Sequence, residues 1–164
     1  MYITFEEYSD LYDPMDEKLF NRLVFDACRV IDIHTTGIDN IKKLQMFFPT
    51  DEYDSQAVKR CAAEIIHLQH QIFQAETAAM ESSGFETTEM GMRGKVISSV
   101  SAGNESISYA TGNTSATAID AAVKDKTARD KLLAETVREY LSGVQDANGV
   151  NLLFMGMYPR RYLC

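Results

Sequence analysis

Apolar residues recur at helical spacing along one stretch, from Ser55 to Ser82, which contains neither Gly nor Pro. Its apolar positions are Val58, Cys61, Ala62, Ile65, Ile66, Ile72, Phe73, Ala75 and Ala79. This period predicts a single helix, roughly 42 Å long at the usual helical rise. Asp54 or Ser55 is positioned to cap its start, and Gly84 follows its end. Because a helix of this length with one apolar face is unstable alone in water, it must pack against other helices.

Two helices are predicted before the long one. Thr4 and Glu7 have the spacing of a capping box, which predicts a short helix beginning at Thr4. Asp13 followed by Pro14 then predicts the start of a longer helix, because Asp is a favoured N-cap and Pro is favoured at the first helical position. Gly37 closes that helix. The two helices and the long one can share a single apolar seam.

The connection from Ile38 to Tyr53 is too apolar for a solvated loop, so a short helical turn pinned to the core is expected. Ala118 to Ser142 again has helical spacing and stops at Gly143. Two readings of residues 111–125 stay open, because they suit either a helix that joins this one or a polar loop.

Between these helices the pattern changes. Residues 95–101 and 105–110 are rich in Ser and β-branched residues and flank a short loop that contains Gly103, which predicts a β-hairpin. Its apolar residues are Val96, Val100, Ile107 and Tyr109. They are too few for an independent sheet, so we expect the hairpin to contact another subunit.

The last stretch, residues 150–164, is apolar and extended in character. We expect it to be an arm that docks on a neighbouring protein, since a contiguous apolar patch near a terminus usually marks an interface. The predicted docking residues are Leu152, Leu153, Phe154, Met155, Met157, Tyr158, Arg160 and Arg161. The alternative is that this segment folds back onto its own helices. In all, the pattern predicts a mainly α chain with one domain over residues 1–164, namely a bundle of about four helices with an inserted β-hairpin and an extended C-terminal arm.

Charge narrows the possible functions of this 164-residue chain, whose net charge is −8. Acids gather at its start, where the first 17 residues hold six acids and no base. These acids are Glu6, Glu7, Asp10, Asp13, Asp16 and Glu17. Such a surface does not bind nucleic-acid phosphates, because that requires clustered Lys and Arg, but it lets a polyanion pass without sticking. No apolar run approaches the ~20 residues needed to span a bilayer and no signal peptide is evident, so a soluble protein is expected.

No residue constellation indicates catalysis. Glu64 and His67 have the Glu-x-x-His spacing of di-iron bundles, but the chain lacks the second such pair that those sites need. Neither Cys28 nor Cys61 has an active-site signature, and both are expected to be buried thiols in a reducing compartment. We therefore expect no enzyme, no metal site and no cofactor. The eight methionines suit either core filling or a soft contact surface.

Several weak patterns carry more information by their order than alone. They are Tyr2-Ile3-Thr4-Phe5-Glu6-Glu7-Tyr8, Phe20-x-x-Leu23-x-x-x-Ala27-x-x-x-Ile31-Asp32, Val58-Lys59-Arg60-Cys61-Ala62-Ala63-Glu64-Ile65-Ile66, Glu105-Ser106-Ile107-Ser108-Tyr109-Ala110, Val137-Arg138-Glu139-Tyr140-Leu141-Ser142-Gly143 and Leu152-Leu153-Phe154-Met155-Gly156. In this order the chain resembles the head–tail connector (adaptor) proteins of long-tailed bacteriophages and prophages. Residues 111–125 depart from that pattern as an insertion, and residues 159–164 extend the usual ending.

The resemblance implies a structural virion protein, made in the cytoplasm of the host bacterium and placed in the virion neck. It implies a homo-oligomeric ring of about a dozen copies under the portal protein, with a neck, stopper or tail-completion protein attached below. DNA passes through the ring without sequence-specific binding, and no membrane is involved. The acidic cluster would line or border this channel, the hairpin would join subunits, and the arm would reach the portal. A rival class is a small helical protein-binding or regulatory module that acts as a monomer or dimer, with a self-contained core and a disordered C-terminal tail. A metal-dependent bundle enzyme is the third.

Overall fold

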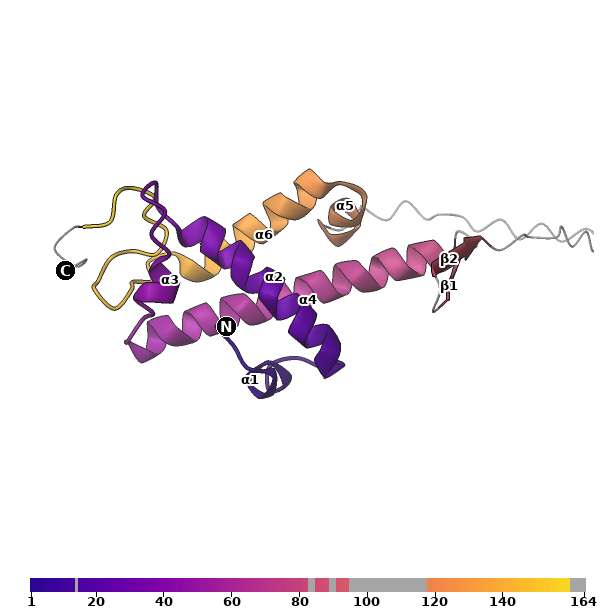
Figure 1. Ribbon diagram of the computed structural model, residues 1–164, viewed down its shortest axis with the longest axis horizontal. Coiled ribbons are helices and arrows are strands. Elements are labelled where there is room, and N and C mark those ends of the chain that lie inside the picture. The colour runs from indigo at the N-terminus through magenta and orange to yellow at the C-terminus, as the bar shows by residue number, and fades with distance from the viewer. Residues whose placement is uncertain (14, 83–84, 89–90, 95–117, 160–164) are drawn as a thin grey trace, which may run out of the picture.

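The computed structural model describes residues 1–13, 15–82, 85–88, 91–94 and 118–159. These residues form a mainly helical fold, as predicted, with six helices and one pair of short strands. Three longer helices cross one another and make the body of the molecule (Figure 1). None of the described helices combines the length and apolar character needed to cross a membrane.

Helix α1 (Phe5–Ser9) begins with the predicted capping box. The Thr4 hydroxyl accepts the backbone N–H of Glu7 at 3.2 Å, and the Glu7 carboxylate accepts the backbone N–H of Thr4 at 2.9 Å. This reciprocal pair satisfies two backbone donors that the first turn leaves free. Tyr8, on the inner face of α1, is buried in the core.

Helix α2 (Glu17–Thr35) begins three residues later than predicted, because Asp13 and not Asp16 was the predicted N-cap. The N-cap is Asp16, whose carboxylate accepts a backbone N–H of the first turn at 3.2 Å. Met15 before the cap and Phe20 in the next turn are both buried, at the two positions that form a hydrophobic staple. Burial of Met15 favours the start at Asp16, and the prediction from the Asp13–Pro14 pair is wrong.

The connection to the long helix contains α3 (Lys43–Met46), the short helical turn that was predicted, with Leu44 in the core. Helix α4 (Glu52–Ser82) confirms the long helix and begins slightly earlier than predicted. The Asp51 carboxylate caps it by accepting the backbone N–H of Asp54 at 3.2 Å, so neither predicted cap is used.

The question left open for residues 111–125 is answered for residues 118–125, and residues 111–117 lie outside the described part of the chain. Helix α5 (Ala118–Lys124) and helix α6 (Lys126–Leu141) are separate, because Asp125 between them is extended and caps α6 by accepting the backbone N–H of Thr127 at 2.9 Å. Gly143 has a φ of +82° and ends α6 as predicted.

The described strands are β1 (Phe85–Thr88) and β2 (Gly91–Gly94), which pair antiparallel directly after α4. They precede the hairpin predicted over residues 95–110, which is not supported and lies outside the described residues. Its four apolar residues, Val96, Val100, Ile107 and Tyr109, lie outside them too.

The core lies where α2, α4 and α6 meet the N-terminal segment. Its largest fully buried apolar side chains are Tyr8, Phe20, Ile3, Ile31, Leu44, Ile65, Ile66, Leu141 and Leu152. Leu152 belongs to the C-terminal loop, residues 144–159, which lies beside α3 at one end of the molecule (Figure 1). The core is therefore closed at that end by the last described residues of the chain.

Candidate interaction site

The C-terminal loop is folded onto its own helices, so the prediction of a free arm is wrong for part of it. Leu152 is fully buried and Tyr158 is 2% exposed, which leaves neither available to a partner. The Leu152 backbone N–H donates to the carbonyl of Val144 at 2.9 Å, and the Ile38 N–H donates to the carbonyl of Met155 at 3.0 Å. These contacts correspond to the alternative in which the segment folds back.

A buried lysine holds this loop. Lys43, the first residue of α3, has no exposed surface, and its Nζ donates to the backbone carbonyls of Leu152 at 3.0 Å, Asn151 at 3.4 Å and Phe154. Burial lowers the pKa of its ammonium, while the charges of Asp146 and Asp39 oppose that shift. Three carbonyl oxygens satisfy the three donors of an ammonium group, so the charge is accommodated through backbone atoms.

Tyr158 locks the end of the loop. Its phenol donates to the Asp146 carboxylate at 2.5 Å and accepts from the Asn148 amide at 3.0 Å, while its ring stacks on Phe47 with centroids 5.0 Å apart. Its backbone N–H donates to the Asp39 carboxylate at 2.5 Å, and that bond is the main cause that lowers the pKa of Asp39. The loop is thus held in its middle by Lys43 and near its end by Tyr158, through buried or half-buried polar contacts.

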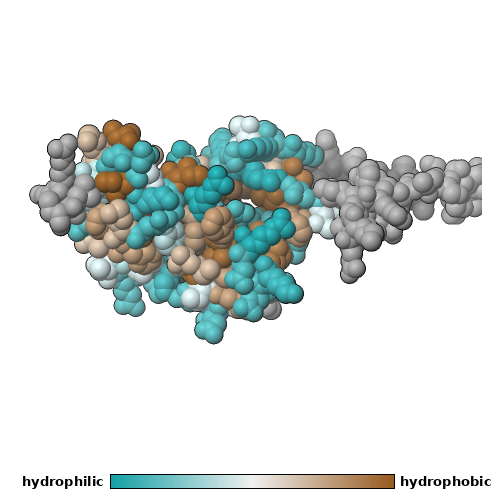
Figure 2. All heavy atoms as spheres, viewed as in Figure 1, coloured by the Kyte–Doolittle hydropathy of each residue, from teal (hydrophilic) through white to brown (hydrophobic). Residues whose placement is uncertain are grey.

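The side chains that the loop leaves outside are strongly apolar. We call Ile38, Phe154, Met155 and Met157 the apolar end; their exposed fractions run from 48% for Phe154 to 74% for Ile38. Figure 2 shows hydrophobic patches at this end of the molecule, with hydrophilic surface between them. Three of the eight predicted docking residues therefore lie together on the surface. Leu153 is partly buried against the core, and the remaining pair, Arg160 and Arg161, lies outside the described residues.

The predicted acidic face divides into two groups. Asp10, Asp13, Glu6 and Glu17 are exposed. Glu7 is half-buried and pairs with Lys59 of α4 at 2.5 Å, and this hydrogen bond is the main cause that lowers the pKa of Glu7. The last member, the N-cap of α2, is exposed but has a backbone partner. Within the described residues, the side chains of the other four acids form no hydrogen bond or ion pair that would hold them in place.

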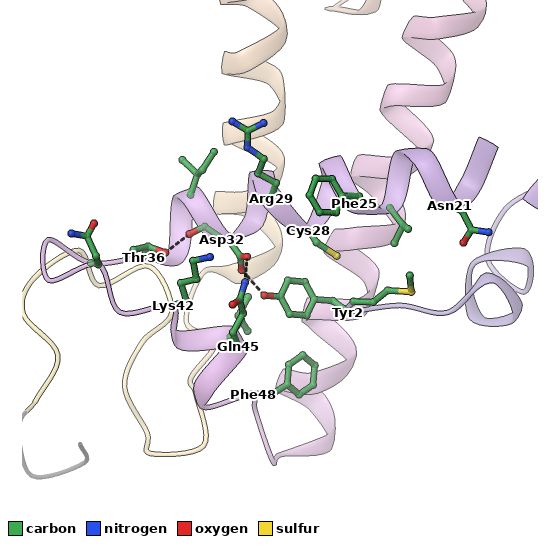
Figure 3. A pocket seen from close by; sticks show the side chains of 16 residues that line it. Tyr2, Asn21, Phe25, Cys28, Arg29, Asp32, Thr36, Lys42, Gln45 and Phe48 are labelled. Atoms are coloured by element: carbon green, nitrogen blue, oxygen red, sulfur yellow. Dashed lines mark hydrogen bonds between the residues drawn. The ribbon is translucent and has the colours of Figure 1, made fainter. Parts of the chain in front are cut away.

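A groove that the sequence pattern did not predict lies between the N-terminus, α2 and α3 (Figure 3). It encloses about 1180 Å³, and Phe25 and Ile33 at its side are 71% and 57% exposed. The sequence signal for it is that Phe25 and Ile33, two turns apart on α2, do not belong to the apolar stripe that faces the core. We call this hollow the α2 groove.

Hydrogen bonds fix the floor of the α2 groove. The Tyr2 phenol and the Gln45 amide both donate to the Asp32 carboxylate, the latter at 2.6 Å (Figure 3). Burial is the main cause that raises the pKa of Tyr2, and this hydrogen bond adds to it. The one carboxylate in the groove is therefore already engaged by two donors.

The Glu-x-x-His pair is engaged in packing. The Tyr12 phenol donates to the Glu64 carboxylate, and the Tyr12 ring stacks on His67 with centroids 4.3 Å apart. A ring nitrogen of His67 also forms a hydrogen bond with the Gln71 amide at 2.8 Å. Among the described residues no group of three or more His, Cys, Asp or Glu side chains is arranged to hold a metal ion.

The two cysteines in the described part of the chain, Cys28 and Cys61, have thiols that favour the protonated form. Cys61 is fully buried and burial raises the pKa of its thiol to about 12. Cys28 is half-buried beside the α2 groove, and burial raises its pKa too. Thiols held in the protonated form are poor nucleophiles.

Comparison with protein-family models, with curated proteins and with solved structures found no match to this chain.

Proposed function

We propose that this chain is a structural head–tail connector of a long-tailed bacteriophage or prophage. In this role it forms a ring under the portal protein, joins the DNA-filled head to the neck and tail, and surrounds the DNA channel. The observation that carries the proposal is the apolar end, an exposed apolar surface on a loop whose backbone is firmly held.

A held loop favours tight docking. Binding loses free energy when a flexible loop must be ordered, and a loop that is already ordered avoids that cost. The Lys43 and Tyr158 contacts order the backbone of the C-terminal loop before any partner arrives. Met155 and Met157 then offer flexible apolar side chains that adapt to a partner surface, and the stiffer Ile38 adds to the apolar area. The portal is the partner to which we assign this surface.

The acidic face supports the DNA channel in this proposal. Four exposed carboxylates near the N-terminus carry negative charge with no described cation beside them: Glu6, Asp10, Asp13 and Glu17. A wall of this charge repels phosphates and lets a genome slide past.

One observation favours a second function, a small helical protein-binding module that acts as a monomer or dimer. The described core is closed by the chain's own C-terminal loop, with Leu152 fully buried, as expected for a self-contained module. The ordered loop is not the disordered C-terminal tail that was also expected for this class, at least over residues 144–159. In this second function the same apolar end would bind a cellular protein.

The test replaces the apolar end without touching the core. The double variant Met155→Lys/Met157→Lys changes two exposed side chains, and a matched control, Leu11→Lys/Phe73→Lys, changes two exposed apolar side chains elsewhere. Each variant replaces the wild-type gene in the phage or prophage that encodes it, and electron microscopy counts heads with and without tails. We expect separated heads and tails for the first variant and joined particles for the control.

Two outcomes contradict the connector. Normal yields of joined particles with Met155→Lys/Met157→Lys would exclude the apolar end as the docking surface. Purified virions that lack this protein altogether, measured by mass spectrometry, would exclude a structural virion role and leave the binding module.

A further inference from the structure

The α2 groove has apolar walls that nothing in the described chain covers. Phe25 and Ile33 are exposed side chains of α2, and Met1, which is 79% exposed, also lines the groove. Burial of apolar side chains is favourable, so a surface with three exposed ones favours an occupant.

The charge of the groove restricts that occupant. Arg29 and Lys42 line it, both are exposed, and neither forms an ion pair with another described residue. Asp32 also lines it and accepts hydrogen bonds from Tyr2 and Gln45, two neutral groups that leave its charge in place. Two cations against one carboxylate make the side chains of the groove net positive, on a chain whose net charge is −8. The groove suits an acidic segment that carries an aromatic or aliphatic side chain.

The same chain carries such a segment on a different surface. A second hollow of about 890 Å³ lies where α4 begins and α6 ends, and it shares no lining residue with the α2 groove. We call Asp51, Glu52, Tyr53 and Glu139 the acidic corner. Tyr53 at its rim is 81% exposed, and all three acids are exposed. Arg60 is the single cation that lines this hollow.

We propose that the acidic corner of one copy docks in the α2 groove of a second copy. Tyr53 supplies the apolar anchor against Phe25, and the acids approach Arg29 and Lys42. Tyrosine is among the residues that dominate interface energies, and opposite potentials fix its partner and speed the encounter. Because two different surfaces of one chain meet, the contact is head-to-tail and repeats from copy to copy.

This contact would supply the repeating interface that the proposed ring requires. The number of copies in that ring rests on the proposed function and not on the contact. The contact itself rests on the two surfaces. The test reverses their charges with Arg29→Glu/Lys42→Glu in the groove and Glu52→Lys/Glu139→Lys in the corner. Asp51 is left in place because it caps α4.

Sedimentation velocity of the full chain follows the mass as concentration rises. Wild type should grow from 18.4 kDa towards larger species, and each charge-reversed variant alone should associate at least tenfold more weakly. An equal mixture of the two variants should regain wild-type association, because every groove then finds a corner of opposite charge. Lys18→Glu/Arg22→Glu on α2 and Asp130→Lys/Glu135→Lys on α6 are matched controls outside both hollows and should behave as wild type.

Three results overturn the contact. They are wild type that stays at 18.4 kDa at millimolar concentration, variants that associate as wild type does, and a mixture that fails to regain association. If wild type stays monomeric while Arg29→Glu/Lys42→Glu blocks head–tail joining, the groove binds another protein and the proposed function stands. If the mixture regains association while virions lack the protein, the contact stands and the proposed function falls.

Discussion

At the scale of single residues, Lys43 shows how a charged side chain takes a core position. It donates to three carbonyl oxygens of the C-terminal loop, so its ammonium needs no carboxylate in direct contact. An ion that is stripped of water is stable only when its hydrogen bonds are replaced, and here the backbone replaces them.

Replacing this lysine tests that account. Lys43→Met keeps much of the side-chain length but leaves the carbonyls of Asn151, Leu152 and Phe154 without this donor, which should lower the free energy of unfolding by about 3 kcal/mol. Lys42→Met, at the exposed neighbouring position, should change it by less than about 0.5 kcal/mol. Urea denaturation of both variants measures the difference; equal stabilities would show that the lysine does not hold the loop.

Tyr8 gives a prediction of the opposite sign. Its hydroxyl is buried without a hydrogen-bond partner among the described residues, so Tyr8→Phe should leave stability at pH 7 unchanged or raise it by up to about 1 kcal/mol. Tyr12→Phe, in contrast, removes the bond to Glu64 and should lower stability by about 1 to 2 kcal/mol. Thermal unfolding of the two variants distinguishes them.

Alkaline pH should widen the benefit of Tyr8→Phe. Burial is the main cause that raises the pKa of Tyr8, to about 12, whereas an unfolded tyrosine ionises near pH 10. The protonated folded form therefore contributes fully below pH 10, and that contribution is lost as pH rises from 10 to 12. At pH 11 the variant should gain about 1 kcal/mol on wild type beyond the difference at pH 7.

At the scale of elements, one arginine joins three helices. Arg129 of α6 donates through Nε to the carbonyl of Ala122 in α5 at 3.1 Å and pairs with Glu76 of α4. The Asp125 cap separates α5 from α6, so this side chain ties the short helix back to the long one.

Arg129→Ala should loosen α5 while leaving the rest of the fold in place. We expect amide exchange in α5 to speed up by about tenfold or more, because local opening then loses both contacts of the guanidinium. Lys131→Ala is the matched control, since its pair with Glu135 is exposed and 3.8 Å long. Unchanged exchange in α5 would contradict the tie.

The elements also show what the sequence alone predicts. The capping box at Thr4, the long helix and the stop at Gly143 were predicted because local rules determine them. The start of α2 was misplaced because burial of Met15, a tertiary contact, selects Asp16 over Asp13.

The candidate site was harder to predict than the helices. An apolar segment after a helix stop reads equally well as an arm or as a folded loop, and the choice depends on a lysine more than one hundred positions earlier in the chain. A lysine is expected on the surface from its hydropathy, so the sequence around Lys43 does not indicate that its side chain binds the C-terminal loop. The α2 groove was missed for the same reason, because its two walls come from separate elements.

At the scale of the whole molecule, the uneven charge yields a prediction about DNA passage. Glu6→Lys/Asp10→Lys/Asp13→Lys changes three exposed acids and spares the two that cap helices, Glu7 and Asp16. If this face borders the channel, the added cations bind phosphates and slow genome ejection.

The control makes the same charge change elsewhere. Asp26→Lys/Asp130→Lys/Glu135→Lys alters three exposed acids on α2 and α6 and should eject DNA at the wild-type rate. Fluorescence of a DNA-binding dye outside triggered particles follows ejection in time. Equal rates for the two variants would remove the acidic face from the channel.

The way in which the C-terminal loop is held also bears on how this chain changes over generations. Lys43 donates hydrogen bonds to backbone carbonyl oxygens, which every residue possesses. These bonds therefore do not depend on the side chains at positions 155 and 157. The crossing of Gly37 with Gly156 excludes a side chain, since an added Cβ would meet backbone or the Phe154 ring, and Gly149 disfavours one because its φ is +77°. Mutations at the two methionines are thus nearly free of penalty for folding. When the partner protein changes in evolution, single substitutions at positions 155 and 157 can therefore adapt this surface without a compensating mutation that restores the fold.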